Sequence, residues 1–235
     1  MINRDLLEQY AKDIDVVLDN NMLSQFQVYA GELLGTNRMY NLTAITNPDD
    51  VLVKHFVDSL MLLKYFDLDY GMKIIDIGSG AGFPGIPLLI AKNNKLQLTM
   101  VDSIAKKIRF LENALQSCGL EAQIVCERAE VLGQDAQYRE QYDVATARAV
   151  ANLSALCEYC LPLVKVGGYF IALKGSLDEV SDAQHAIEVL GGETESNVSY
   201  KLPNGDARSL VIIRKISQTP TEYPRKSKKI TTKPL

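Results

Sequence analysis

The chain has 235 residues, 47% of them hydrophobic, and a formal net charge of −4, which suits one globular domain with a small appendage and argues weakly against a nucleic-acid partner. No window reaches the roughly 18 uninterrupted apolar residues of a membrane span, and residues 1–15 lack the apolar segment of a secretory signal. The four cysteines are too few and too scattered for a disulfide framework or a zinc site, so we expect reduced thiols, no bound metal and a cytoplasmic location.

The charge is unevenly distributed along the chain. Residues 214–235 hold seven basic side chains and one acid, Glu222, so this stretch carries +6 and residues 1–213 carry −10. A basic tail on an acidic body is compatible with a polyanionic partner. It is equally compatible with a solvated, frayed terminus.

The first 70 residues are expected to form a helical cap. Apolar spacing predicts helices within residues 6–18 and 23–34. A third helix is predicted from residue 48 to 66, because Asn47 can cap it and Pro48 suits its first position. Asp49 and Asp50 then favour the positive end of the helix dipole.

After residue 70, short apolar strands alternate with helices. Strands are predicted at 73–78, 96–102, 122–127, 142–149, 167–175, 193–203 and 208–216. Helices are predicted at 84–93, 105–119, 153–164 and 177–192. The alternation predicts an α/β domain at residues 71–216 with a doubly wound, mostly parallel seven-stranded sheet and an antiparallel edge. Residues 1–70 would cap this domain, and residues 217–235 would form a basic tail.

A glycine-rich turn directly follows the first predicted strand, where ligands bind in open α/β sheets. The residues of interest in it are Asp76, Gly78, Gly80, Gly82 and Phe83. The glycines from Gly80 to Gly85, with Asp102 further on, also fit a dinucleotide fingerprint. However, a carboxylate at Asp76 would repel a pyrophosphate and would suit the cationic amino-acid part of S-adenosylmethionine. We therefore favour this methyl donor, and a fold of the S-adenosylmethionine-dependent methyltransferase type, over a dinucleotide or a turn without a ligand.

Three further strand ends carry candidate residues. Asp102 can accept hydrogen bonds from ribose hydroxyls, or it can cap the next helix. Ala129 and Glu130 would lie beside the adenine, or in a plain loop. Arg148 follows the fourth strand and would face the donor's methyl group, where its rigid fork suits phosphate or guanine. The alternative for Arg148 is an ordinary surface ion pair.

Six segments together resemble, in this order, the glucose-inhibited division protein B family, whose members are bacterial methyltransferases that act on guanine N7 of 16S ribosomal RNA. The segments are NLTAI (41–45), KHFVDSL (54–60), DIGSGAGFPGIPL (76–88), DSIAKKIRFL (102–111), ARAVANLSAL (147–156) and YPRK (223–226). The resemblance spans about residues 37–226. It implies S-adenosylmethionine as cofactor and 16S ribosomal RNA or the small ribosomal subunit as partner.

The resemblance also implies roles for individual residues. Contacts with the donor are implied at Gly78, Phe83, Ala129, Glu130 and Arg148. Asn41, His55 and Asp58 would line the substrate side, although His55 could instead be a structural helix-face histidine.

Methylation of guanine N7 needs no general base, because this nitrogen carries a lone pair and no proton. The catalytic candidates are therefore residues that align the reactants. Arg148 would position the guanine or its phosphate, and Asn41 and His55 would hold the nucleotide. A methyltransferase acting on a protein or small molecule, and a donor-binding protein without catalysis, are the alternatives. Nothing in the sequence indicates an obligate dimer, so a monomer is expected.

Overall fold

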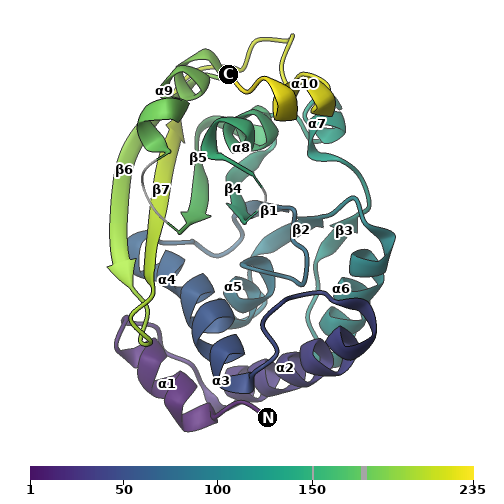
Figure 1. Ribbon diagram of the computed structural model, residues 1–235, viewed down its shortest axis with the longest axis vertical. Helices are drawn as coiled ribbons and strands as arrows, with labels where there is room; N and C mark the ends of the chain where they lie inside the picture. The colour runs from purple at the N-terminus through teal and green to yellow at the C-terminus, as the bar shows by residue number, and fades with distance from the viewer. Residues whose placement is uncertain (150, 176–178) are drawn as a thin grey trace.

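The computed structural model (Figure 1) describes residues 1–149, 151–175 and 179–235. Its centre is one seven-stranded sheet in the order β3-β2-β1-β4-β5-β7-β6. The strands are β1 (Lys73–Ile77), β2 (Gln97–Val101), β3 (Gln123–Val125), β4 (Tyr142–Arg148), β5 (Val164–Lys174), β6 (Gly192–Lys201) and β7 (Ala207–Lys215). The predicted fold class is confirmed.

The strand order reverses at β1, which pairs in parallel with β2 on one side and with β4 on the other. The antiparallel edge is also confirmed, because β7 pairs antiparallel with both β5 and β6. In such a sheet, the loops that follow β1, β2 and β4 open onto a common crevice.

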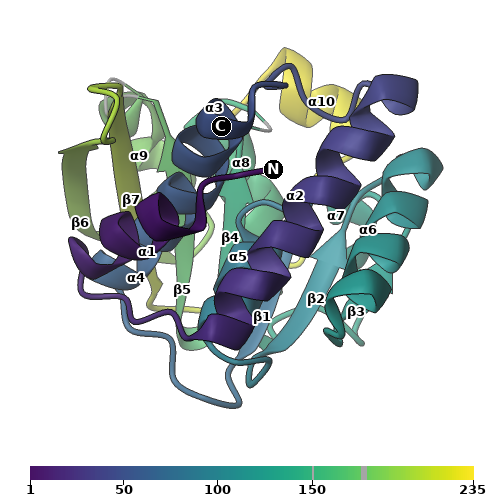
Figure 2. The ribbon, with the colours of Figure 1, turned by 90° about the horizontal axis from the view of Figure 1, so that it is seen from below.

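Helices cover both faces of the sheet (Figures 1 and 2). One hydrophobic cluster joins the N-terminal helices to α5 and α6, and a second lies under α8, α9 and α10. After the first strand, the helices are α5 (Gly85–Ala91), α6 (Ala105–Cys118), α7 (Ala129–Leu132), α8 (Leu153–Cys160), α9 (Val180–Val189) and α10 (Ser227–Thr232). The predicted helix over 177–192 begins with residues 177 and 178, which lie outside the described residues, as does Val150.

The N-terminal cap consists of α1 (Arg4–Lys12), α2 (Asn20–Tyr40) and a helix from Pro48 to Tyr65, divided into α3 (Pro48–Val51), a π-helical segment η1 (Leu52–Val57) and α4 (Asp58–Tyr65). The predicted N-cap of the third helix is confirmed, since the Asn47 side chain accepts from the Asp49 amide at 2.8 Å. The prediction of a first helix to residue 18 was wrong. It ends at Lys12 because the chain turns through Asp15, which has φ 61°, a conformation that aspartate tolerates better than most residues.

The helix predicted over 153–164 also ends early, at Cys160. Pro162 lies in the short 3₁₀ turn Leu161–Leu163 that follows, and a proline inside a helix removes a hydrogen bond and clashes with the preceding turn. Strand β5 therefore begins at Val164, three residues before its predicted start. Cys157 and Cys160 are fully buried in the second hydrophobic cluster.

The basic tail folds back onto α8 rather than fraying. Arg225 makes a double hydrogen-bonded ion pair with Glu158, in which Nη2 lies 2.6 Å from Oε2 and Nε lies 2.8 Å from Oε1. Glu158 and Ile230 have no exposed surface, and α10 packs beside α8 and α7 (Figure 1). The sequence did not predict α10.

A second basic residue near the C-terminus, Lys215, also lies inside the protein. Lys215 is fully buried, and its Nζ donates to the Leu161 carbonyl at 2.7 Å and to the Thr219 hydroxyl. Burial lowers the pKa of Lys215 to about 8. Arg225 and Lys215 therefore serve packing, and the lysines of 226–233 remain as the outward-facing charge of the tail.

We expect Arg225→Met to lower the free energy of unfolding by about 3 kcal/mol, because it leaves the Glu158 carboxylate buried without its partner. Urea denaturation followed by circular dichroism would measure the change. The matched control is Arg214→Met on the exposed side of β7, which should change stability by less than about 0.5 kcal/mol. A loss at Arg225 no greater than that of the control would contradict the assigned role of this ion pair.

Candidate functional site

The glycine turn after β1 is held by hydrogen bonds to its neighbours. The Ser79 amide donates to the Val101 carbonyl at 3.0 Å, and the Ser79 hydroxyl donates to the Asp76 carbonyl at 2.9 Å. Gly82 has φ 99°, and a Cβ there would lie 2.7 Å from the Tyr29 hydroxyl. That hydroxyl donates to the Ala81 carbonyl at 2.5 Å, so α2 packs directly on the turn and requires a glycine at this point.

Asp76 lies beneath the turn and has no exposed surface. Its Oδ1 accepts from the Thr146 hydroxyl at 3.1 Å, and its Oδ2 accepts from the Gly85 amide at the start of α5 at 3.3 Å. Burial, the largest influence, raises the pKa of Asp76 to about 6 despite these hydrogen bonds. The sequence argument placed this carboxylate in direct contact with a ligand. In the structure it faces the interior and fixes the position of the turn.

A cavity of about 360 Å³ lies above the ends of β1, β2 and β3. Four predicted cofactor residues line it: Gly78, Asp102, Ala129 and Glu130. Ser227 and Thr231 of α10 line the same cavity. The structure therefore brings the three predicted strand-end loops together and adds a wall from the tail.

Asp102 is 5% exposed at the rim of this cavity. Its Oδ2 accepts from the Gly80 amide and from Lys107 Nζ, both at 3.1 Å, and its Oδ1 accepts from the Ile104 amide at 3.0 Å. The helix-capping alternative is not met, because the N-cap residue of α6 is Ile104 and, among the described residues, no side chain caps the first turn of this helix. The same carboxylate thus ties the glycine turn to α6 while it borders the cavity.

A second cavity, of about 320 Å³, adjoins the first and shares Ala149 with it. Its lining includes Lys54, His55, Asp58, Arg148, Lys174 and Arg208. Ala149 has φ 56°, a left-handed conformation that costs a non-glycine residue about 1 kcal/mol. Strain of this kind at a junction between cavities is typical of functional sites.

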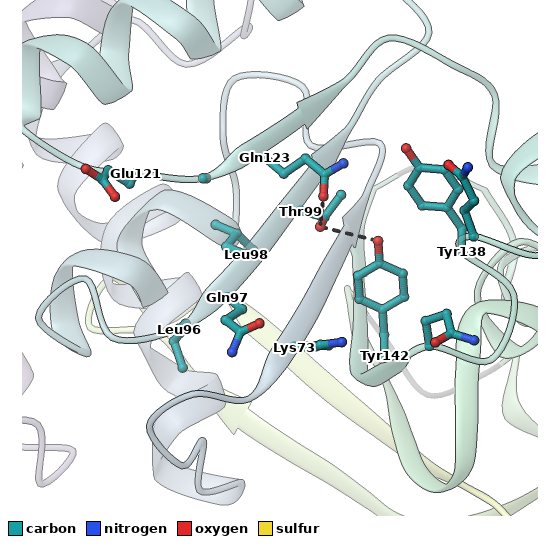
Figure 3. Close-up of a pocket in the computed structure, with 12 residues that line it drawn as sticks. Lys73, Leu96, Gln97, Leu98, Thr99, Glu121, Gln123, Tyr138 and Tyr142 are labelled. Atoms are coloured by element: carbon teal, nitrogen blue, oxygen red, sulfur yellow. Dashed lines mark hydrogen bonds between the residues drawn. The ribbon is translucent and has the colours of Figure 1, made fainter.

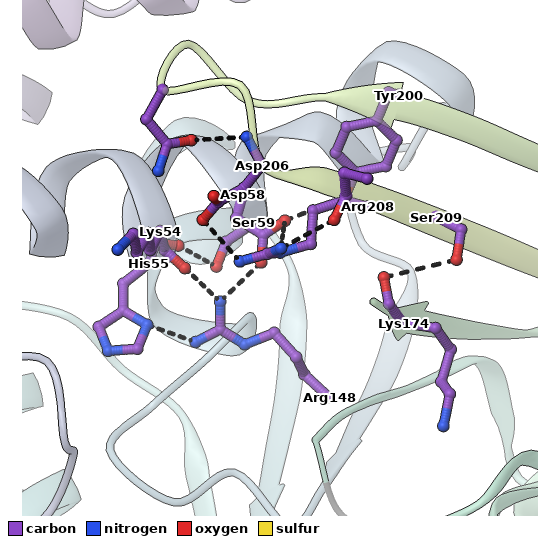
Figure 4. Close-up of polar contacts among 12 residues, drawn as sticks. Lys54, His55, Asp58, Ser59, Arg148, Lys174, Tyr200, Asp206, Arg208 and Ser209 are labelled. Carbon is purple, nitrogen blue, oxygen red and sulfur yellow. Dashed lines mark hydrogen bonds and ion pairs between the residues drawn. The ribbon is translucent and has the colours of Figure 1, made fainter. Parts of the chain in front are cut away.

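Arg148 is the centre of a polar network in this second cavity (Figure 4). Its Nη1 donates to Asp58 Oδ2 at 3.1 Å and to the Lys54 carbonyl at 3.2 Å, and its Nη2 lies 3.0 Å from His55 Nδ1. The guanidinium also lies over the ring of Phe83, 4.7 Å from its centroid. The predicted ion-pair alternative for Arg148 is therefore present, but it is buried and joins the sheet to the helical cap.

His55 is a neutral member of this network. Burial and the neighbouring Arg148 charge lower the pKa of His55 to about 3. Because a guanidinium can only donate, Nδ1 accepts from Arg148, and Nε2 therefore donates to the Thr43 hydroxyl at 2.9 Å. The imidazole also stacks on Phe83 with a centroid distance of 4.3 Å. Phe83 is only 5% exposed and supports His55 and Arg148 from below.

Asp58 holds the other end of the network. The Tyr200 hydroxyl donates to Asp58 Oδ1 at 3.1 Å, and Arg208 Nε lies 3.7 Å from the same oxygen. The carboxylate of Asp58 thus connects α4 with β4, β6 and β7.

Asn41 lies at the C-terminal end of α2, where it is exposed and has φ 49°. The end of α2 is linked to His55 by Asn37 and Thr43 rather than by Asn41. Asn37 Nδ2 donates to the Thr43 carbonyl and Asn37 Oδ1 accepts from the Thr43 amide, both at 2.9 Å. Thr43 lay within a motif quoted from the sequence, whereas nothing in the local pattern distinguished Asn37.

A further cavity, of about 570 Å³, lies at the other end of the parallel strands, where they begin (Figure 3). Its lining includes Thr99, Gln123, Tyr138 and Tyr142, and none of the predicted site residues. It borders the first residues of β1 and β4 rather than their last. The candidate site is therefore the pair of smaller cavities at the ends of β1, β2 and β4.

Comparison with known proteins decides the family. The model of the rRNA small subunit methyltransferase G family, also called GidB, matches residues 22–211. The chain belongs to this family. The resemblance seen in the sequence is thereby confirmed.

Relatives of the family match nearly the full chain. The chain is 46% identical to the ribosomal RNA small subunit methyltransferase G of Alkaliphilus metalliredigens, with 100% of both proteins covered. It is 44% identical to that of Alkaliphilus oremlandii over 99% of this chain and 98% of the relative. The corresponding Lactobacillus acidophilus protein is 46% identical, with 93% of each covered. The chain is thus a methyltransferase of this family.

More distant solved structures share the fold. An S-adenosylmethionine-dependent O-methyltransferase from Thermotoga maritima has a TM-score of 0.52 at 15% identity, covering 80% of this chain and 72% of that one. A methyltransferase-like structure from Thermoplasma acidophilum has a TM-score of 0.51 at 16% identity, covering 65% of this chain and 71% of that one.

Within the described ranges, no helix is both long and apolar enough to cross a membrane.

The pH dependence of stability tests the burial of Asp76. The folded carboxyl keeps its proton up to about pH 6, whereas the unfolded one loses it near pH 4. The folded state therefore binds more protons between these values, and the contribution of Asp76 to stability falls as the pH rises through this window. The free energy of unfolding of the wild type minus that of Asp76→Asn should fall by about 2 kcal/mol from pH 4 to 7.

Urea titrations at a series of pH values would measure this difference. The control is Asp69→Asn, at an exposed position before β1, whose stability curve should run parallel to that of the wild type. Parallel curves for Asp76→Asn as well would show that this carboxyl is not perturbed as the structure indicates.

Proposed function

We propose that the protein transfers the methyl group of S-adenosylmethionine to N7 of a guanine in 16S ribosomal RNA of the small ribosomal subunit. The observation that carries the proposal is the pair of adjoining cavities that share Ala149. One is lined by four of the residues expected to hold the donor, and the other is rich in cationic side chains. The names of the relatives support small-subunit ribosomal RNA as the substrate.

The first cavity suits a cofactor with hydroxyl and amino groups. The carboxylates of Asp102 and Glu130 border it, and Gly78 leaves backbone accessible at its floor. Carboxylates accept hydrogen bonds from a ribose and an amino group, and they disfavour the phosphates of a dinucleotide. The bound donor would supply a methyl group on a positively charged sulfur. Asp76 would contribute from below by fixing the Gly85 amide, where the glycine turn passes into α5.

The second cavity suits a nucleotide. Lys54, Lys174 and Arg208 line it around Arg148, and cations at close range attract phosphates. Ala149 is common to both cavities. A guanine held beside Arg148 would therefore meet the donor across this residue.

The mechanism that follows is one of alignment. N7 would take the methyl group of a bound donor as its bond to sulfur breaks, and no proton has to be removed from the ring. Holding two reactants in this arrangement can lower a barrier by about 7–11 kcal/mol at best. Arg148 is suited to this task because Asp58, His55 and the Lys54 carbonyl fix its guanidinium. We assign His55 to orienting Arg148, and Asn41 to a nucleotide contact at the exposed end of α2.

Incubation with labelled S-adenosylmethionine tests the reaction. Small ribosomal subunits, naked 16S RNA, a protein extract and a metabolite mixture would be offered in turn, and any modified base would be mapped. We expect label on a guanine of the ribosomal substrate and cleavage at that base after N7-specific chemistry. Label on protein or metabolite alone would favour the alternative methyltransferase functions.

Asp102→Asn tests the cofactor cavity. We expect about 10-fold weaker binding of S-adenosylmethionine in isothermal calorimetry, because a neutral amide replaces a charge-assisted acceptor. Glu112→Gln, at an exposed position on α6, is the control and should bind as the wild type does. Unchanged affinity in Asp102→Asn would place the donor elsewhere.

Arg148→Lys tests alignment. Lysine keeps the charge but cannot contact Asp58, His55 and the Lys54 carbonyl in one plane. Turnover on the ribosomal substrate should fall by about 100-fold, as expected when a positioning group is displaced, while the dissociation constant for the donor changes little. The control is Arg214→Lys, at an exposed position near the end of β7. Full turnover by Arg148→Lys would refute the positioning role.

A further inference from the structure

A groove of about 570 Å³ is lined by residues of α1, α4 and β6. Three tyrosines line it: Tyr10 from α1, Tyr65 from α4 and Tyr200 from β6. Two lysines, Lys64 and Lys201, line it as well. None of these residues was a candidate from the sequence.

The groove adjoins the candidate site through one side chain. The Tyr200 hydroxyl donates to Asp58, which lines the cavity of Arg148 and is paired with that arginine (Figure 4). The ring of Tyr200 lines the groove and packs against Tyr65 with centroids 5.9 Å apart. Tyr200 therefore contacts both the groove and the hydrogen-bond network around Arg148, so the two lie on either side of its neighbourhood.

The surface of the groove combines aromatic rings with uncommitted positive charge. Tyr10 and Tyr65 are partly exposed, and Lys64 and Lys201 are exposed. In the part of the chain that the structure describes, no carboxylate lies within ion-pair distance of either ammonium group. Asp13 is the one acidic residue in the lining. Proteins that bind single-stranded nucleic acid use this combination, with bases stacked on aromatic rings and phosphates held by lysines.

We propose that the groove binds an unpaired nucleotide next to the target guanine. Its base lies against Tyr65 and Tyr10, and its phosphate contacts Lys64 or Lys201. The inference rests on the proposed function, because the occupant is the strand whose guanine lies beside Arg148. Stacking tolerates any base, so the groove selects an unpaired strand rather than a sequence.

An unpaired strand also agrees with the chemistry at the target. In an A-form stem, N7 faces a deep, narrow groove that side chains enter poorly. A neighbouring nucleotide held on Tyr65 would keep the strand away from its stem while the guanine occupies the Arg148 cavity.

Two groove variants test the proposal, Tyr65→Leu and Lys201→Gln. Matched controls come from a lysine–tyrosine pair outside the groove, because Lys95 Nζ lies 4.5 Å over the ring of exposed Tyr70. The control variants are Tyr70→Leu and Lys95→Gln. The probe is a fluorescein-labelled single-stranded RNA of mixed sequence, measured by anisotropy at several salt concentrations, with binding to small ribosomal subunits measured in parallel.

We expect Tyr65→Leu to weaken RNA binding by about 10-fold, as the loss of one stacked base does. Lys201→Gln should lower the slope of log affinity against log salt by about 0.7, the value for one phosphate contact on a single strand. The controls should bind as the wild type does, and all four variants should bind S-adenosylmethionine unchanged. RNA carrying 4-thiouridine should crosslink to peptides that contain Tyr10 or Tyr65.

Wild-type RNA affinity in Tyr65→Leu and Lys201→Gln, with crosslinks outside the groove, would overturn the proposal. If Tyr65→Leu proves unstable, exposed Lys201 and the crosslink decide the question. Failure of the proposed function has a separate signature, since wild-type protein would then leave ribosomal RNA unmethylated whatever the groove variants do.

Discussion

The Arg148–Asp58 ion pair is the interaction on which the arrangement of the site depends. Arg148 ends a central strand and Asp58 begins α4, so their 3.1 Å contact joins two parts of the chain that local sequence does not connect. Arg148 also bonds to His55 and lies over the ring of Phe83. Asp58 also accepts from the Tyr200 hydroxyl. A buried charge pair of this kind adds little net stability, but it is costly to break. It therefore fixes one position of the helical cap over the crevice.

Two carboxylates, one fully buried and one at the rim of the first cavity, hold the glycine turn and its junction with α5. Asp76 is fully buried and binds the first turn of α5, whereas Asp102 lies at the rim and binds the glycine turn. Their hydrogen bonds hold the turn from below and from the side. This division explains how a backbone with three positive-φ glycines, Gly78, Gly80 and Gly82, keeps one shape despite the conformational freedom of glycine.

The positions of the strands along the chain and of the site loops could be predicted because their signals are local. Apolar runs, the glycine spacing and the strand-end positions of Asp102 and Arg148 are all visible within short windows. The direction in which Asp76 faces was not, because it depends on Thr146 from another strand. The burial of Lys215 against Leu161 and the docking of the tail on Glu158 likewise depend on partners distant in sequence. Such contacts carry no periodic pattern and emerge only when the layers pack.

The π-helical segment Leu52–Val57 has a consequence for how this region can change. A π turn contains one residue more than an α turn, and such turns are common at functional sites. Both the carbonyl of Lys54 and the ring of His55 reach Arg148 from within it. Deleting a single residue here would restore a regular spiral and rotate Asp58 away from its partner. The irregular segment thus sets the spacing at which the Lys54 carbonyl, the His55 ring and the Asp58 carboxylate all meet Arg148.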